Sequence, residues 1–575
     1  MNQYKDHFTP RMFHRLLAPS LAYSLGLAFA AMADAIVIGW QMGVTGLAAI
    51  CFSLPLHTML LAFVHGLGLG GSTRYARLLA EGKPAQATDC FNRVLQAGLA
   101  VSVLLAALVN LFPQAVLGLL GTTPADGTLY TAAKSYLCLI ASGAPLFLLK
   151  YVLNDFLRCD DNRRLATRGS LYGNGIRIAL DLVFVLVLGL GTAGAAGATL
   201  IGLSVSVLCY LPALFAKGHT LRLAATRPDP RGTLSCLKSG LPAAAPYLYR
   251  MVFFLLANHL LLGIEGENSV AIFAVVQSTA YVILYLYIGA AKAAQPLFRT
   301  FYGEKNLPAA RRALALAMRW GLFAGGTAAA LIFLFPGLIC STFGLHEEAL
   351  QLLGAPALRL YALGSIGAGV SVVLHTYYRS IHEEQNAFII TLLRNFVILL
   401  PCTVFFATSL PQFWWLYPVT ELLTLLLFFV WRCLAGRERL FDAARVYSMT
   451  MHGSSREFTA MADGIAAFCD RWQAAPRQRY FVSMAAAETC SAILAQAPGH
   501  IAEIQVTLVT LEDGDFELHI RDNNDFFDSF SAQADRLGGK GALDIEAVGM
   551  QVIRQQAKEF SYQQYESFST LVVRI

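Results

Sequence analysis

The chain has 575 residues, of which 56% are hydrophobic and only 14% are charged, whereas soluble domains carry roughly 25% charged residues. This deficit excludes an ordinary soluble protein and indicates that most of the chain is surrounded by lipid. The net charge of +6 comes without a run of Lys and Arg, so nucleic acid is not expected as a partner. The 11 cysteines form no CxxC pair and no cluster with histidine, so we expect neither a metal site nor a disulfide framework.

Twelve apolar stretches follow one another through the first three quarters of the chain. A transmembrane helix needs about 20 mostly apolar residues to cross the hydrocarbon core of a bilayer. We therefore predict an all-α polytopic membrane protein with twelve transmembrane helices in the lipid bilayer. The first stretch is too long for a signal peptide and lacks a cleavage site. The predicted spans are 16–40, 53–79, 94–119, 131–157, 168–188, 193–215, 241–264, 269–295, 313–341, 351–378, 387–408 and 412–435.

Lys and Arg are concentrated in alternate connections between these stretches, and the intervening connections contain neither residue. The positive-inside rule places the basic connections in the cytoplasm. Both termini are therefore predicted to be cytoplasmic, in a multi-pass protein of the cell membrane (plasma or inner). The basic residues concerned include Arg74, Arg77, Lys83, Arg158, Arg164, Lys217, Arg222, Arg299, Lys305, Arg311, Arg379 and Arg432.

An internal repeat divides the apolar region into two halves of six spans each. An even number of spans in each half gives both halves the same orientation in the membrane, as parallel repeats. Transporters built from such repeats bind substrate between the halves. The repeated positions are Leu111-Phe112-Pro113 and Leu334-Phe335-Pro336, Pro19 and Pro242, Arg158 and Arg379, and Asn174 and Asn395, at a nearly constant offset of 221 to 223 residues.

The predicted organisation therefore has a membrane part and a soluble C-terminal part. Residues 1–15 are a cytoplasmic tail, 16–215 the first six-helix lobe, 216–240 a cytoplasmic linker and 241–435 the second lobe. A second linker, 436–446, leads to a soluble domain at 447–575. Amphipathic patterning there predicts an α/β sandwich on a mixed sheet. Its predicted helices are 456–472, 477–495 and 545–558, and its predicted strands are 503–511, 515–521, 560–565 and 569–575.

Residues 10 to 436 resemble the multidrug and toxic compound extrusion (MATE) family. The resemblance rests on several short segments in the right order: Ala33 to Gly39, Gly46 to Ile50, Gly66 to Gly71, Gln295-Pro296, and Asp181 followed by Gly191 to Thr199. It implies a secondary exporter of small organic molecules, often drug-like and cationic, by antiport against protons or sodium ions. No catalytic residues are then expected, because a transporter is not an enzyme.

The first lobe carries two carboxylates within its apolar spans, Asp34 and Asp181, and ionisable groups at that depth are costly and usually functional. In the family resembled, acids at these positions form the coupling-ion site, and Thr199 matches a further polar residue of it. The family usually has Asn where this chain has Arg177. Asn174, Arg177 and Asp181 are spaced to share one helix face. Arg177 would then either occupy the place of the coupling cation or form a structural ion pair.

The second lobe is expected to contain no equivalent acid. Two basic residues there, Arg250 and Lys292, would either contact an anionic substrate or extend to the membrane interface.

The soluble domain resembles the histidine-kinase-type ATP-binding fold (Bergerat or GHKL), in particular the small anti-sigma-factor kinases. The segments 487–491, 520–524 and 548–553 match its motifs, which makes Glu488, Asp522 and Gly549 the candidate nucleotide-binding residues. The magnesium position holds Ala492, where the family has Asn. The resemblance therefore implies that ATP is a candidate ligand without efficient hydrolysis, or that the domain binds a cytoplasmic protein partner instead.

Two other functions are left open by the sequence. One is a flippase for lipid-linked oligosaccharides of the same broad superfamily. The other is a membrane-anchored regulator whose soluble domain sequesters or phosphorylates a protein. An ATP-driven pump of the P-loop class is excluded, because the chain contains no GxxxxGK[ST] motif.

Overall fold

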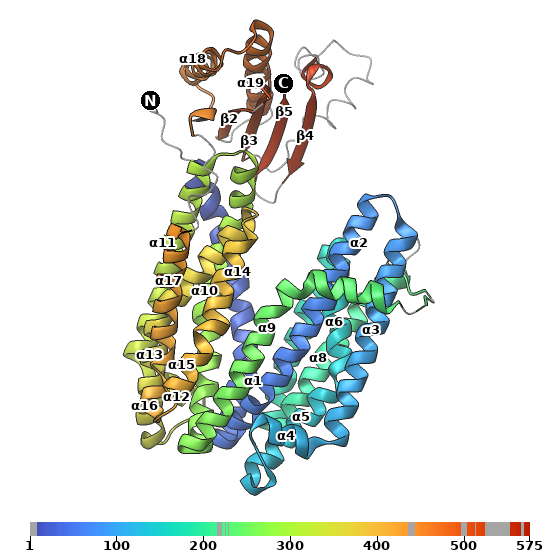
Figure 1. Cartoon of the computed structure of the whole chain (residues 1–575), viewed down its shortest axis with the longest axis vertical. Coiled ribbons are helices and arrows are strands. Elements are labelled where there is room, and N and C mark those ends of the chain that lie inside the picture. The colour runs from blue at the N-terminus through green and yellow to red at the C-terminus, as the bar shows by residue number, and fades with distance from the viewer. Residues whose placement is uncertain are drawn as a thin grey trace.

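The computed structural model describes residues 8–160, 162–215, 221–224, 226–227, 229–434, 443–495, 503–511, 513–523, 552–564 and 568–575. It contains a long helical part and a smaller α/β part at one end (Figure 1). We call residues 8–215 the N-lobe, 229–434 the C-lobe and 443–575 the C-terminal domain.

The N-lobe begins with a very long helix and ends with the sixth predicted span. Its elements are α1 (Phe8–Val64), η1 (His65–Leu69), α2 (Gly70–Ala80), α3 (Pro84–Leu111), α4 (Pro113–Leu120), η2 (Pro124–Asp126), α5 (Thr128–Ser142), α6 (Ala144–Cys159), α7 (Arg163–Asp181), η3 (Leu182–Val187) and α8 (Gly191–Phe215). The C-lobe contains α9 (Pro230–Glu265), α10 (Glu267–Gly303), α11 (Leu307–Leu334), α12 (Pro336–Thr342), α13 (Glu348–Ser380), α14 (Glu384–Leu392), η4 (Leu393–Val397), α15 (Leu399–Phe405), α16 (Leu410–Phe413) and α17 (Leu416–Leu434).

Each of the twelve predicted stretches lies on this helical backbone. Within the described ranges, ten helices are long and apolar enough to cross a membrane, or eleven if the bent pair α5 and α6 forms one span. The segment Phe8–Ala80 is counted once, although its 73 residues exceed a single crossing. It contains the first two predicted stretches, one on each side of a break at Gly43.

The backbone repeats the offset found in the sequence. Gly43 (φ 56°) and Gly266 (φ 66°) are 223 residues apart, and each stands where the chain leaves one long span for the next. Gly121 (φ 112°) and Gly344 (φ 82°) form a second such pair with the same offset. Glycine is the residue that adopts these positive φ values without steric strain. The same turns therefore recur at equivalent places in both halves.

The two lobes contact each other through helices that cross between them. Figure 1 shows α2 to α8 on one side and α10 to α17 on the other, with α1 and α9 between them. A Cβ at Gly240 on α9 would lie 2.0 Å from the carbonyl oxygen of Gly66, and one at Gly289 on α10 would lie 3.0 Å from the side chain of Leu21 on α1. Small residues allow membrane helices this close approach.

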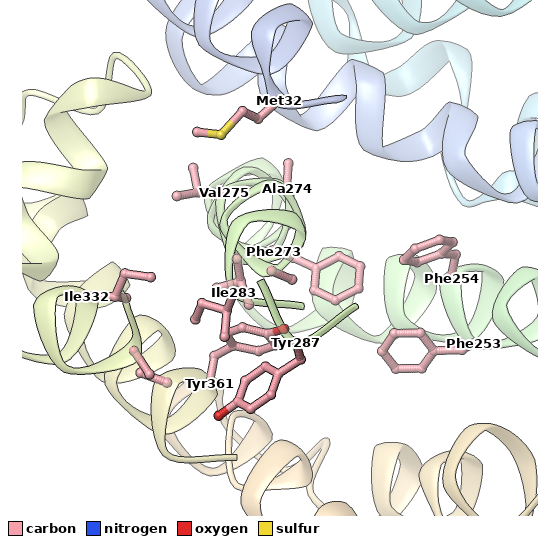
Figure 2. Packing of buried hydrophobic residues seen from close by; sticks show 14 of the residues in the cluster. Met32, Phe253, Phe254, Phe273, Ala274, Val275, Ile283, Tyr287, Ile332 and Tyr361 are labelled. Carbon is pink, nitrogen blue, oxygen red and sulfur yellow. The ribbon is translucent and has the colours of Figure 1, made fainter. Parts of the chain in front are cut away.

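The C-lobe is built around α10, whose side chains are buried among α1, α9, α11 and α13. Figure 2 shows part of this cluster, with Met32, Phe253, Phe254 and Tyr287 among its labelled members. Tyr287 is fully buried, and its ring occupies a slot where α11 and α13 present glycines instead of larger residues. It is therefore a packing residue of the core.

The C-terminal domain contains η5 (Ala443–Arg445), β1 (Val446–Met451), α18 (Ser455–Arg471), α19 (Pro476–Ala495), β2 (Ile504–Thr510), β3 (Phe516–Asp522), β4 (Glu559–Gln564) and β5 (Ser569–Arg574). The sheet order is β1-β2-β3-β5-β4, and all four described pairings are antiparallel. The expectation of a mixed sheet was wrong. Strand β1 was not predicted, and it begins at Val446, the last residue of the predicted linker. Residues 552–556 are helical, and the rest of the helix predicted at 545–558 lies largely outside the described residues.

The two faces of this sheet have different chemistry. Ile504, Val506, Leu518 and Ile520 belong to one apolar cluster with α18 and α19. The alternate residues point to the opposite face, because side chains alternate along a strand. On that face polar side chains are nevertheless buried, namely Gln505, Thr507, His519, Arg521 and Thr570. They are buried because this face lies against the ends of the membrane helices.

Several charged groups join the sheet to the membrane part. Glu304, at the C-terminal end of α10, forms an ion pair with Arg521 on β3, and both side chains are almost completely buried. The Arg521 guanidinium also lies 4.8 Å from the centre of the Phe301 ring on α10. Next to β2, Glu503 forms an ion pair of 2.6 Å with Arg11 near the start of α1. The C-terminal domain is thus attached to α1 and to the C-lobe.

Candidate transport site

Asp34 on α1 and Arg177 on α7, two of the residues predicted to form the site, contact each other directly. Arg177 donates two hydrogen bonds to Oδ1 of Asp34, from Nε at 3.2 Å and from Nη2 at 2.7 Å. Its Nη2 also donates to the carbonyl oxygen of Ala30 at 3.1 Å. The two side chains are 22% and 15% exposed, so this ion pair lies within the helix bundle. Asp34 is therefore held by a resident guanidinium.

The second carboxylate, Asp181, lies one turn further along α7 and is fully buried. Its Oδ2 is 3.8 Å from Nε of Arg177, an ion-pair contact that is too long for a hydrogen bond. Within the described part of the chain, neither oxygen of Asp181 accepts a hydrogen bond. A buried ionised carboxylate without donors is strongly disfavoured. Asp181 is therefore a buried carboxylate beside the Asp34–Arg177 pair, without a hydrogen-bond donor among the described residues.

The structure does not bring all five predicted residues into one set of contacts. Asn174 is half-buried on α7 and makes no hydrogen bond to the described residues. The hydroxyl of Thr199, on the neighbouring helix α8, is buried and has no hydrogen-bond partner among them. Tyr136, which was not predicted from the sequence, is a buried residue of α5 that lies within electrostatic range of Asp34 and Arg177. An isolated tyrosine in an apolar span gives no signal that distinguishes it from a packing residue.

The C-lobe contains a buried acid, Glu421, at a position that is not equivalent to Asp34 or Asp181 of the N-lobe. Glu421 on α17 accepts a hydrogen bond from Nε of Arg394 at 2.6 Å. Each lobe thus has a buried arginine–carboxylate pair, but the pairs use different helices: α7 with α1 in the N-lobe, and η4 with α17 in the C-lobe. Both residues stand in otherwise apolar stretches, so the signal that identified Asp34 was also present here.

Arg394 and Glu421 line a cavity inside the C-lobe. Its volume is about 70 Å³, and its walls come from α9, α10, α13, η4, α15 and α17. Arg250 of α9 also lines it, together with Gln277, Tyr361, Tyr417 and Thr420. The other basic residue considered in this lobe, Lys292, lies instead with its ammonium group 5.5 Å from the centre of the Tyr23 ring on α1. Of the two, Arg250 is the one that lines this cavity.

The predicted nucleotide residues are described only in part. Glu488 is half-buried on α19, and Asp522 is buried at the end of β3, the strand that packs against α19. Ala492, at the predicted magnesium position, is also buried. Gly549 and the loop around Asn524 lie outside the described residues. Glu488 and Asp522 thus belong to neighbouring elements. The nucleotide site itself stays a prediction, because its other residues lie outside the described ones.

Comparison with known proteins gives a family match over both lobes. A family model described as MatE matches residues 19–183 and 242–405, which is more than half of the chain and reproduces the repeat offset. A FAD transporter from Shewanella oneidensis is 25% identical over 402 residues, covering 68% of this chain and 86% of the relative.

Among solved structures, an inward-facing multidrug resistance MATE family transporter of the MOP superfamily has a TM-score of 0.64 at 22% identity, covering 71% of this chain and 94% of that chain. An outward-facing structure of such a transporter has a TM-score of 0.55 at 22% identity, with 74% and 96% covered. These matches confirm the mostly helical, polytopic membrane fold.

Proposed function

The chain belongs to the MatE family of multidrug efflux transporters, and from this premise we propose that it exports small organic molecules by antiport against protons. Family membership makes it a multi-pass membrane transporter and not an enzyme. The single observation that carries the choice of coupling ion is the Asp34–Arg177–Asp181 cluster in the N-lobe.

The cluster favours protons over sodium ions. A sodium site needs several oxygen ligands, and Oδ1 of Asp34 already accepts two hydrogen bonds from Arg177. Asp181 has no hydrogen-bond donor among the described residues. With both carboxylates ionised the cluster has a net charge of −1, and one proton makes it neutral. Protonation of Asp181 would therefore remove the charge imbalance, and release of that proton would restore a negative charge that can attract a cationic substrate.

The arrangement of the lobes supports an inward-open state. At the end of the membrane part away from the C-terminal domain, Trp40 on α1 donates a hydrogen bond of 2.8 Å to the carbonyl oxygen of Thr342. A Cβ at Gly344 would lie 2.0 Å from the carbonyl oxygen of Gly39, so the backbones touch there. Toward the other end the two groups of helices spread apart (Figure 1). The higher of the two TM-scores, to the inward-facing structure, agrees with this reading.

We place the protein in the cell membrane. The C-terminal domain and the N-terminal part of α1 then lie on its cytoplasmic side. The contact between Phe8 and Phe568, whose ring centres are 6.5 Å apart, supports a common side for both ends of the described chain. The basic connections support the cytoplasmic side. A cysteine introduced at Ser455, in a chain freed of its exposed native cysteines, should resist a membrane-impermeant label in intact cells. Ready labelling would reverse the assigned orientation.

The C-terminal domain is proposed to regulate transport. It contacts the end of α10 through Arg521 and the start of α1 through Glu503, so it is attached to elements that move when the lobes change their relative position. A ligand such as ATP can shift that equilibrium only if it binds one arrangement more tightly than the other. The face of the sheet that carries Arg521 lies against the membrane helices, which supports these helices as the partner of the domain. The flippase and the membrane-anchored kinase are not favoured by the family match.

Transport by the purified full-length protein in lipid vesicles tests the proposal. Vesicles with an imposed proton gradient, an imposed sodium gradient or neither are loaded with a fluorescent organic cation. We expect the proton gradient to drive movement of the dye and the sodium gradient to have little effect. Sodium-driven movement without a proton gradient would contradict the assignment of the coupling ion, and the absence of any driven movement would contradict export itself.

A further inference from the structure

The cavity in the C-lobe has an unbalanced charge. It is lined by two guanidinium groups, Arg250 and Arg394, and by one carboxylate, Glu421. Arg394 and Glu421 neutralise each other through their contact of 2.6 Å. Tyr361 lines the same cavity as all three charged groups. The remaining positive charge belongs to Arg250.

Among the described residues, Arg250 has no counter-ion of its own. It is half-buried on α9, and no described residue forms a hydrogen bond or an ion pair with it. A charged side chain at membrane depth is costly unless it is paired or faces a polar cavity. Arg177 and Arg394 both meet this cost with a carboxylate. Arg250 differs from both because it lines the cavity without a carboxylate partner among the described residues.

The neutral groups around the cavity add hydrogen-bond donors and aromatic walls. Gln277 donates from Nε2 to the hydroxyl oxygen of Tyr417 at 2.9 Å, so the hydroxyl proton of Tyr417 is left for another acceptor. The rings of Tyr361 and Tyr417 meet edge to face at 4.9 Å. Figure 2 shows Tyr361 and Phe253, another residue of the cavity wall, within the core of this lobe. A planar guanidinium beside hydroxyl donors matches a carboxylate or a phosphate.

We propose that this cavity is a subsite for the carboxylate or phosphate group of a transported molecule, with Arg250 as its counter-ion. The inference rests on the proposed transport function and specifies a substrate class for it: organic molecules that carry an acidic group, including zwitterions. A volume of about 70 Å³ holds one such group and no large ring system. The rest of the molecule then lies outside the cavity.

Equilibrium binding to the full-length protein in detergent tests the subsite. The probes are a cationic rhodamine ester and the free acid of the same dye, which differ only in the carboxylate. We expect the acid to bind more tightly than the ester. Arg250→Gln should lower the affinity for the acid by about tenfold or more, as for a lost charge-assisted hydrogen bond, and leave the affinity for the ester unchanged. Arg250→Lys should keep part of the preference, because it keeps the charge without the planar fork.

The matched control is Arg359→Gln. Arg359 lies on α13 of the same lobe and packs over the Phe333 ring at 5.9 Å, away from the cavity. The Arg359→Gln variant should leave the affinities for the acid and for the ester unchanged. If Arg250→Gln does not fold, Tyr417→Phe is measured instead. This variant removes the hydroxyl donor and should lower the affinity for the acid about threefold. Equal affinity for acid and ester in the unmodified protein, including no binding of either, overturns the subsite. So does an equal effect of Arg250→Gln on both dyes.

Proton-driven transport of both dyes separates this inference from the function on which it rests. If both dyes are transported but binding of the acid does not depend on Arg250, export is supported and the subsite is overturned. Selective binding of the acid without driven transport of either dye would support the subsite and contradict export.

Discussion

Arg177 on α7 donates two hydrogen bonds to one oxygen of Asp34 on α1, although the two residues are 143 positions apart in the chain. This pair joins the first and fifth predicted spans of the N-lobe. It leaves Asp181, one turn away on α7, buried without a hydrogen-bond donor among the described residues. The pair therefore distinguishes the two carboxylates, since Asp34 accepts hydrogen bonds from Arg177 and Asp181 accepts none from the described residues.

Asp34→Asn should abolish proton-driven export and leave a folded protein in the membrane. The amide keeps the size of the side chain but removes the negative charge that balances Arg177, so that Arg177 shifts its interaction to Asp181 and holds it ionised. Dye transport in vesicles measures the activity, and thermal unfolding in detergent measures the fold. Asp463→Asn, at an exposed position of α18, is the control and should transport normally. Undiminished export by Asp34→Asn would remove Asp34 from the coupling site.

Arg177→Asn restores the residue usual in the family and should make the protein dependent on sodium. Removing the guanidinium leaves Asp34 and Asp181 without a cation, at a cost of up to about 3–5 kcal/mol for a buried pair that loses one partner. We expect thermal unfolding to be lowered in choline and largely restored by sodium, because the ion takes the place of the guanidinium. Equal unfolding temperatures in the two salts, both well below that of the unmodified protein, would favour a purely structural ion pair.

Arg521→Met should loosen the C-terminal domain from the membrane part. The substitution leaves Glu304 buried at the end of α10 without its guanidinium partner. Limited trypsin digestion reports the change, since Arg437 and Arg439 lie in the connection to the domain. We expect cleavage there to become roughly tenfold faster. The control is Arg479→Met, which removes a surface pair with Asp470 and should change little. Unchanged cleavage in Arg521→Met would mean that this contact does not hold the domain.

Glu457 should make the stability of α18 depend on pH under acidic conditions. Burial acts to raise its pKa, but hydrogen bonds from Ser454 and His452 outweigh burial and lower the pKa from 4.5 to about 2. A lowered pKa stabilises the fold above the unfolded value near 4.5, and this stabilisation is lost as the pH falls toward about 2. Glu457→Gln should therefore speed hydrogen exchange of residues 455–471 at neutral pH by about fivefold, the effect of a lost helix cap.

The pH profile separates this cap from a general loss of stability. After correction for intrinsic exchange rates, the unmodified protein should lose protection of α18 between about pH 4.5 and pH 2. Glu457→Gln should show a much smaller change across the same window. A parallel decline in both proteins would assign the acid sensitivity to other groups.

ATP should bind the C-terminal domain weakly or not at all, without a requirement for magnesium. The magnesium position of the family resembled is occupied by Ala492, which is buried and has no oxygen to offer. Calorimetry on the full-length protein with ATP, in the presence and absence of magnesium, measures this. Magnesium-dependent hydrolysis that is lost in Glu488→Ala would revive an enzymatic role for the domain.

The sequence by itself determined the local features of this protein. Apolar stretches of sufficient length identified the helices, because backbone groups in lipid must satisfy their hydrogen bonds within the segment. The constant offset between the halves anticipated the paired turns at Gly43 and Gly266. In the C-terminal domain, periodic patterns located α18, α19 and four of the five strands within a few residues. Each of these properties depends on residues that are close in the chain.

Only the tertiary structure decided which charges meet. The pairs Arg177–Asp34, Arg394–Glu421 and Arg521–Glu304 each join two different helices, or a helix end and a strand. The periodicity of one helix indicates which face a charge lies on, but the partner depends on the packing and relative height of two helices. For the same reason Arg250 could not be recognised as unpaired from its sequence context. Whether a buried charge has a partner is a property of the three-dimensional packing around it, and this property separates a structural ion pair from a candidate binding group.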